Sequence, residues 1–122
     1  MVLDDEPIVC ERAKDFLDKK GIATETYTDS QSALKRIKEK TFDVIVSDVK
    51  MEGATGIDVL FTVKKDNLPT EVIIITGYGA FDTFREAEAV GVFDFITKPF
   101  KMDDLYRKIK KAAKKAQKDR QQ

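Results

Sequence analysis

Residues 43–48 read Asp-Val-Ile-Val-Ser-Asp, and residues 71–76 read Glu-Val-Ile-Ile-Ile-Thr. Both runs are dominated by consecutive β-branched residues, without the polar alternation of a strand that has one face in water. Continuous runs of this kind are typical of central strands in a parallel sheet that is covered on both faces. We therefore take residues 43–47 and 71–76 as two central strands and place the rest of the chain around them.

Amphipathic stretches separate these runs from three weaker strand candidates at residues 1–3, 23–27 and 92–96. Five helices are expected: one from Pro7 to the Gly21 stop, one capped by Ser30, one around 57–66, one around 84–90 and one from about Met102. Repeated β-α-β units with short links favour right-handed crossovers. They predict an α/β fold: a flavodoxin-like, doubly wound parallel sheet of five strands in the order 2-1-3-4-5, with five helices.

The size and charge of the chain set limits on its organisation. With 122 residues, 42% of them hydrophobic, the chain supplies one core, and we expect a domain over residues 1–118. The net charge is zero, but nine basic and only three acidic residues fall in 101–122. We expect residues 119–122 to be a frayed basic tail or the start of a linker. A solvated helix face explains the lysines better than a nucleic-acid site, because few aromatic residues lie among them.

Two residue counts exclude whole classes of site. The chain has no histidine and one cysteine, Cys10, so it lacks the residues for a Cys/His zinc site, a Ser-His-Asp triad or an internal disulfide. No stretch approaches the roughly 20 apolar residues of a membrane span. We expect a cytoplasmic protein without direct contact to a membrane or to nucleic acid.

Acidic side chains follow two strands that the predicted order makes neighbours. Asp4 and Asp5 come directly after residues 1–3, and Asp48 ends the run that begins at residue 43. Ligands of open α/β sheets bind beyond the carboxyl ends of the strands. Carboxylates gathered there repel one another unless a cation joins them. Because only oxygen ligands are at hand, Mg²⁺ is the favoured ion.

The other two strand ends carry groups that bind anions. Thr76 closes the run at 71–76, and Lys98 follows the strand candidate at 92–96. A hydroxyl and an ammonium beside a divalent cation suit a tetrahedral anion. The four strand ends together predict a site for phosphoryl transfer onto a carboxylate.

At this point the sequence resembles the receiver domains of response regulators in two-component signalling. The resemblance rests on four motifs in order, over roughly residues 1–114: Asp4-Asp5-Glu6, Asp48-Val49-Lys50-Met51 with Gly56, Thr76-Gly77, and the segment 93–100 that contains Lys98-Pro99. It implies that Asp48 is the phosphoacceptor and takes its phosphoryl group from the phosphohistidine of a sensor histidine kinase or phosphotransfer protein. By the same resemblance, Mg²⁺ is held by the Asp5 and Asp48 carboxylates, by Asp4 through water, and by the main-chain carbonyl of Lys50.

The resemblance also implies roles for the remaining residues. Thr76 would bond the acyl phosphate, Lys98 would pair with it, and the Lys98-Pro99 bond would be cis. Thr76 and Phe95 would form the switch that reshapes the surface of the fourth helix, fifth strand and last helix. A downstream protein or a fused output domain would read that surface, and a homodimer is a further state open to it.

Two other functions remain open from the residues alone. A receiver-like scaffold that is never phosphorylated would have no need of Asp4, Asp5, Asp48, Thr76 and Lys98 together. A phosphatase or phosphotransferase with Asp48 as nucleophile would want a second acid two residues later, where Lys50 stands. The leading hypothesis is a signalling module that performs chemistry only on itself and is not an enzyme acting on a separate substrate.

Overall fold

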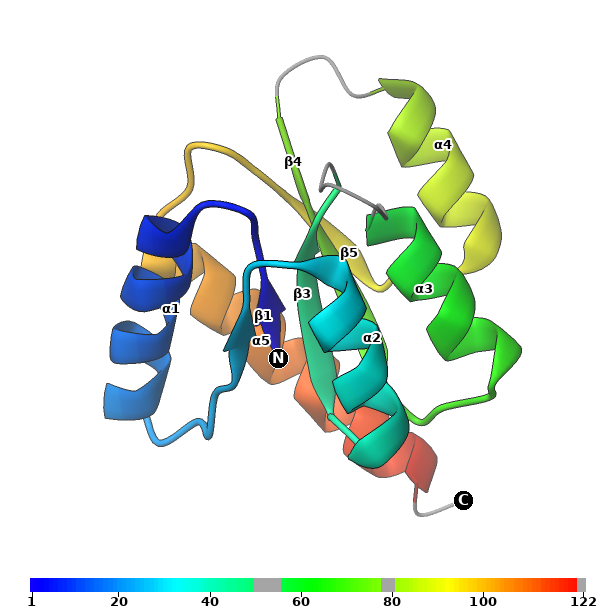
Figure 1. The fold of residues 1–122 in the computed structure, drawn as a ribbon, viewed down its shortest axis with the longest axis horizontal. Helices are drawn as coiled ribbons and strands as arrows, with labels where there is room; N and C mark the ends of the chain where they lie inside the picture. Colours follow the sequence, from blue (N-terminus) through cyan, green and yellow to red (C-terminus); the bar gives the residue numbers. More distant parts are fainter. Residues whose placement is uncertain (50–55, 78–80, 121–122) are drawn as a thin grey trace.

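The computed structural model describes residues 1–49, 56–77 and 81–120, and it has the alternating order of strands and helices that the sequence predicts (Figure 1). The elements are β1 (Val2–Leu3), α1 (Pro7–Lys19), β2 (Thr26–Tyr27), α2 (Ser30–Glu39), β3 (Val44–Asp48), α3 (Gly56–Lys65), β4 (Glu71–Thr76), α4 (Phe81–Val90), β5 (Asp94–Thr97) and α5 (Met102–Arg120). All four strand pairings are parallel and follow the order β2-β1-β3-β4-β5. The predicted flavodoxin-like topology is confirmed.

Helices cover both faces of the sheet, with α1 and α5 on one side and α2, α3 and α4 on the other (Figure 1). Each face of the sheet has its own hydrophobic core, and successive residues of a central strand point alternately into the two cores. In β4, Ile73 and Ile75 pack with residues of α1 and α5, whereas Ile74 packs with residues of α2, α3 and α4. All three isoleucines are fully buried. Burial on both faces is the reason that the central runs show no polar alternation.

The first two strands are shorter than expected, two residues each where 1–3 and 23–27 were predicted. β1 nevertheless pairs with both neighbours, since Val2 stands opposite Thr26 on one side and Val46 on the other. The ladder reaches the chain terminus, where the Met1 amine donates to the Val44 carbonyl oxygen at 2.9 Å. Burial of this amine lowers its pKa to about 5.

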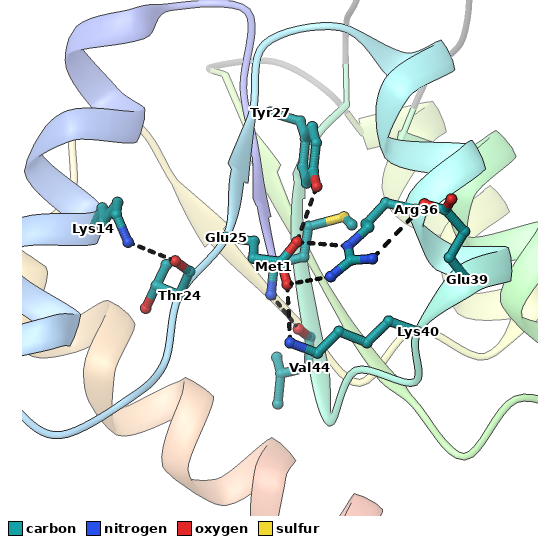
Figure 2. Close-up of polar contacts among 9 residues, drawn as sticks. All are labelled: Met1, Lys14, Thr24, Glu25, Tyr27, Arg36, Glu39, Lys40 and Val44. Atoms are coloured by element: carbon teal, nitrogen blue, oxygen red, sulfur yellow. Dashed lines mark hydrogen bonds and ion pairs between the residues drawn. The ribbon is translucent and has the colours of Figure 1, made fainter.

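The edge strand β2 is tied to α2 by a polar cluster around Glu25 (Figure 2). The Glu25 carboxylate accepts from Arg36 Nε at 2.8 Å, from Lys40 Nζ at 2.9 Å and from the hydroxyl of Tyr27 at 2.9 Å. The hydrogen bonds from Arg36 and Lys40 lower the pKa of Glu25 to about 2. The two residues of β2 form few hydrogen bonds with β1, and the polar cluster adds contacts that hold this edge strand against α2.

One expectation about a helix start differs from the structure. The cap of α2 is Asp29, whose carboxylate accepts from the Ser32 amide at 2.8 Å, and Ser30 is the first helical residue instead. The last helix, expected to begin at about Met102, runs from Met102 to Arg120, and Arg120 forms an ion pair with Asp43.

The helix α5 is anchored to the sheet by further ion pairs. Lys108 lies 2.7 Å from Asp94, and Lys115 lies 2.7 Å from the buried Glu71. Some lysines in the basic stretch are therefore committed to holding α5 on its strands. Among the described helices, α5 included, none has the length and apolar content to cross a membrane.

Candidate functional site

Four of the strand-end residues selected from the sequence stand at the carboxyl end of the sheet. Asp4 follows β1, Asp48 is the last residue of β3, Thr76 is the last residue of β4, and Lys98 follows β5. The parallel register carries each to the same level: Asp48 is opposite Ile75, and Thr76 is opposite Thr97. The backbone joins them further, because the Lys98 amide donates to the Thr76 carbonyl at 2.8 Å.

The Lys98 ammonium joins three carboxylates at this end of the sheet. Its Nζ lies 2.9 Å from Glu6 Oε1, 3.0 Å from Asp4 Oδ2 and 3.3 Å from Asp48 Oδ2. Burial alone would lower the pKa of Lys98, but hydrogen bonding to Glu6 and Asp4, with the negative charge of Asp48, raises it. Lys98 therefore remains a cation that contacts all three carboxylates.

Asp4 is the most deeply buried acid of the site, with none of its surface exposed. Its Oδ1 accepts from the Glu6 amide at 2.9 Å, which also fixes the chain at the start of α1. Desolvation raises the pKa of Asp4, and the charge of Asp48 adds to the increase, whereas the Glu6 amide and Lys98 oppose it. A buried acid of this kind gains stability from a cation beside it.

The acidic run after β1 has the geometry of a metal site. One carboxylate oxygen from each of Asp4, Asp5 and Glu6 lies within 4.8 Å of those of the other two. Asp5 and Glu6 are exposed, so an ion would have access from solvent. Every side-chain donor here is a carboxylate oxygen, while the nearby Cys10 thiol donates to the Asp4 and Tyr27 carbonyls and faces the chain. The donor set fits Mg²⁺.

Glu6 is the site residue that the sequence interpretation did not assign to a role. It belongs to the quoted acidic motif, but its contact with Lys98 joins two segments far apart in the sequence. The only sequence signal is its place in the acidic run directly before Pro7. Lys50, selected for its main-chain carbonyl, lies outside the described residues.

Gly56 packs closely against the backbone at the end of β3. The Gly56 amide donates to the Val49 carbonyl at 3.1 Å, which brings the start of α3 against the end of β3. A Cβ at residue 56 would lie 2.7 Å from the Asp48 carbonyl oxygen and 3.0 Å from Ile74 Cδ1. Only glycine fits this approach, which accounts for its place eight residues after Asp48.

The two residues selected as a switch also lie close to this end of the sheet. Thr76 is buried, and its hydroxyl lies 3.5 Å from that of Thr97. Phe95 is partly buried and stacks on Phe84 of α4, with ring centroids 3.7 Å apart and an interplanar angle of 20°. The Lys98-Pro99 peptide bond is cis, as the resemblance implied.

A cavity of about 700 Å³ lies away from these groups. It opens where β1 begins, and its lining includes Met1, Leu17, Val44 and Ile109. Since ligands of such sheets bind at the carboxyl ends of the strands, we assign the chemistry to the acidic site and not to this cavity.

Comparison with known proteins finds matches over nearly the whole chain. The family model for the response regulator receiver domain matches residues 1–110. The transcriptional regulatory protein FixJ of Bradyrhizobium diazoefficiens is 33% identical over 116 residues, which cover 95% of this chain and 57% of that protein. The heme response regulator HssR of Staphylococcus epidermidis is 28% identical over 118 residues, covering 96% of this chain and 52% of HssR. The chain thus spans about half the length of these relatives.

Solved structures give the same result. A receiver domain protein from Clostridium thermocellum superposes with a TM-score of 0.88 at 31% identity and covers 95% of this chain and 94% of that one. NtrX from Brucella abortus, solved with ADP, has a TM-score of 0.88 at 30% identity, covering 98% of this chain and 28% of NtrX. A CheY-like receiver from Methanospirillum hungatei has a TM-score of 0.90 at 24% identity, covering 97% of this chain and 94% of that one, and supports the fold.

Proposed function

The chain belongs to the response regulator receiver family, whose members are phosphoryl-accepting switches in two-component systems, and from this we propose that Asp48 is its phosphoacceptor. The observation that supports the choice is the meeting of Asp48, Asp4 and Glu6 at Lys98. Asp48 ends the central strand β3 with 12% of its side chain exposed, so it is held firmly and still meets solvent.

In the proposed reaction, a carboxylate oxygen of Asp48 attacks the phosphorus of a partner's phosphohistidine. The P–N bond breaks and its electron pair stays on the ring nitrogen, so a protonated ring leaves as neutral imidazole. The product is an acyl phosphate on Asp48. In the return step, a water oxygen attacks phosphorus and the P–O bond to Asp48 breaks, which restores the carboxylate and releases inorganic phosphate with a proton.

The other site residues would hold the charge of the phosphoryl group. Asp5, Asp48 and the main-chain carbonyl of Lys50, with Asp4 through water, are the proposed ligands of Mg²⁺, which when bound would supply the positive charge that offsets the phosphoryl oxygens. Lys98, kept charged by its carboxylate neighbours, would pair with one phosphoryl oxygen. The Thr76 hydroxyl would bond another.

The switch proposal follows from the same arrangement. Movement of Thr76 toward the phosphoryl group would vacate space for the Phe95 ring and change the surface of α4, β5 and α5. We propose that this surface is read by a downstream protein, by an output domain or by a second copy. A cytoplasmic kinase or phosphotransfer protein would supply the phosphoryl group.

Incubation with acetyl phosphate and Mg²⁺, followed by intact-protein mass spectrometry, tests the proposal. We expect a mass increase of one phosphoryl group that is lost in Asp48→Asn and retained in the surface control Asp15→Asn. Mg²⁺ binding without any mass change would favour a scaffold. Continuous turnover of phosphate esters would favour a phosphatase or phosphotransferase.

A further inference from the structure

The stacked pair of Phe84 and Phe95 couples α4 to the strand that leads into Lys98. The rings are close to parallel, with centroids 3.7 Å apart, and both side chains are partly buried. Phe84 lies three residues before the fully buried Ala87, and this spacing places the two residues on the same side of α4. The packing of Ala87 on the core therefore fixes the side of α4 that carries Phe84.

The stacked rings share a face of the sheet with the Thr76 hydroxyl. Phe95 stands opposite Ile74 in the register, and Thr97 stands opposite Thr76. Since side chains alternate along a strand, Thr76 points to the same face as Ile74, which packs in one core with Ala87. The 3.5 Å contact between the Thr76 and Thr97 hydroxyls agrees with this. Motion of the Phe95 ring and motion of the Thr76 side chain therefore compete for one space under α4.

We propose that Phe84 is a positioning residue that holds the Phe95 ring in its resting place and so biases the chain toward its unphosphorylated conformation. This inference rests on the proposed function, in which Phe95 turns toward Thr76. Ala87 keeps the backbone of α4 on the core, so Phe84 can follow the ring only by rotation of its own side chain, and we expect the turn to break the stack. Offset or edge-to-face aromatic pairs with centroids about 4.5–7 Å apart correspond to a bias of about 2- to 12-fold between two states. The Phe84 and Phe95 rings are closer and nearer to face-to-face than such pairs, so we take about 12-fold as the upper limit of the bias.

The bias has a reciprocal effect at Asp48. A ligand that binds only the switched state has an apparent affinity lower than its affinity for that state. The reduction equals the factor by which the resting state is favoured. Removal of the stack should therefore raise the population of the switched ring and strengthen the binding of a phosphoryl mimic by the same factor.

Fluorine NMR with 4-fluorophenylalanine at position 95 tests the inference in Phe84→Ala, in Phe84→Leu and in the control Phe61→Ala, which removes an exposed phenylalanine from α3. We expect Phe84→Ala to increase the intensity of the switched resonance by up to about 12-fold without ligand. The beryllofluoride concentration that gives half-saturation in the presence of Mg²⁺ should fall by the same factor. Phe84→Leu keeps an apolar side chain without a ring, so its switched resonance and its beryllofluoride binding should lie between those of the wild type and of Phe84→Ala. Phe61→Ala should match the wild type in both measurements.

Other results would overturn the inference or the function separately. Unchanged resonances in Phe84→Ala, or weaker beryllofluoride binding, would refute a resting role for Phe84. Lower thermal stability without a change in the resonances would leave Phe84 with a structural role only, which also refutes it. If the wild type ignores beryllofluoride, the proposed function fails, and the ligand-free spectra still report whether Phe84 restrains the ring.

Discussion

The Lys98 ammonium lies 3.0 Å from Oδ2 of Asp4, an oxygen that is fully buried. This ion pair, together with the Glu6 amide that donates to Oδ1, compensates the charge of the buried carboxylate. The same ammonium contacts Glu6 and Asp48, so one side chain offsets repulsion among three acids.

Replacement of Lys98 by methionine should destabilise the metal-free protein. It removes the cation and leaves Asp4 buried beside Asp48, at a cost of about 3 kcal/mol in the free energy of unfolding. Urea denaturation in EDTA measures the change. Lys101→Met, an exposed lysine three residues later, should stay within about 0.5 kcal/mol of the wild type. Equal losses in the two variants would contradict the role given to Lys98.

Mg²⁺ should raise the thermal midpoint of the wild type, because an ion that binds only the folded state stabilises it by mass action. At a concentration 100 times the dissociation constant, the gain is about 2.7 kcal/mol. Asp4→Asn should lose most of this gain, while Asp15→Asn on the exposed side of α1 should keep it. Scanning calorimetry with and without Mg²⁺ decides the matter, and a full Mg²⁺ response in Asp4→Asn would remove Asp4 from the ligand set.

Alanine at position 56 should disturb the base of the acceptor site. The added Cβ would meet the Asp48 backbone, which has no flexible end to move aside. We expect a loss of about 1–3 kcal/mol in unfolding free energy, together with slower labelling by acetyl phosphate. Gly77→Ala is the matched control for stability, because a Cβ at residue 77 meets nothing within 4 Å. A Gly56→Ala protein as stable as Gly77→Ala would show that the approach can relax.

The polar cluster in Figure 2 should stabilise the β2 edge through Glu25. Glu25→Gln replaces a carboxylate that Arg36, Lys40 and Tyr27 all contact, and we expect a loss of about 1 kcal/mol. Glu39→Gln, which disturbs only the 3.8 Å pair with Arg36, should cost less than about 0.5 kcal/mol. Chemical denaturation of the two variants provides the comparison, and identical midpoints would contradict the assignment.

Stability should rise between pH 5 and pH 8 because of the Met1 amine. Its pKa is about 5 in the folded chain and 8.0 when exposed, so the unfolded state binds more protons within this window. The chain has no histidine to obscure the effect. We expect a gain on the order of 2–4 kcal/mol across the window. The amine faces Glu25, which raises its pKa, and Lys40, which lowers it.

Acetylation of the amine supplies the control for this pH dependence. The acetylated chain has no charge to lose at Met1, so its unfolding free energy should vary much less between pH 5 and pH 8. A slope that persists after acetylation would assign the effect to another group.

The sequence predicted the sheet order because its signals are local. The β-branched runs at 43–47 and 71–76 identify central strands without knowledge of their partners, and the acids at strand ends follow from the topology. Helix starts were less certain, since Asp29 and Ser30 are adjacent residues that both favour capping. The choice of Asp29 depends on how the preceding chain arrives from β2.

The missed features depend on contacts between distant segments. Glu6 was visible as one more acid, but its pairing with Lys98 requires the turn after β5 to lie over the start of α1. Phe84 looked like an ordinary apolar residue of an amphipathic helix. Its stacking on Phe95 follows from the placement of α4 over β5, which no local pattern encodes.

The anchoring of α5 separates charge in this chain of zero net charge, because the segment 101–120 carries nine basic and three acidic residues, and the separation gives the molecule an electric dipole. Lys115 and Arg120 fasten the helix to Glu71 and Asp43, near the amino ends of β4 and β3, while the acids Asp4, Asp5, Glu6 and Asp48 gather at the carboxyl ends. The molecule should scarcely migrate in an electric field at neutral pH, yet it should turn to align with one. At an ionic strength of about 0.1–0.15 M, the electric field of this dipole acts on other molecules only within roughly 8–10 Å of the surface. An approaching partner would thus be oriented only in the last step before contact.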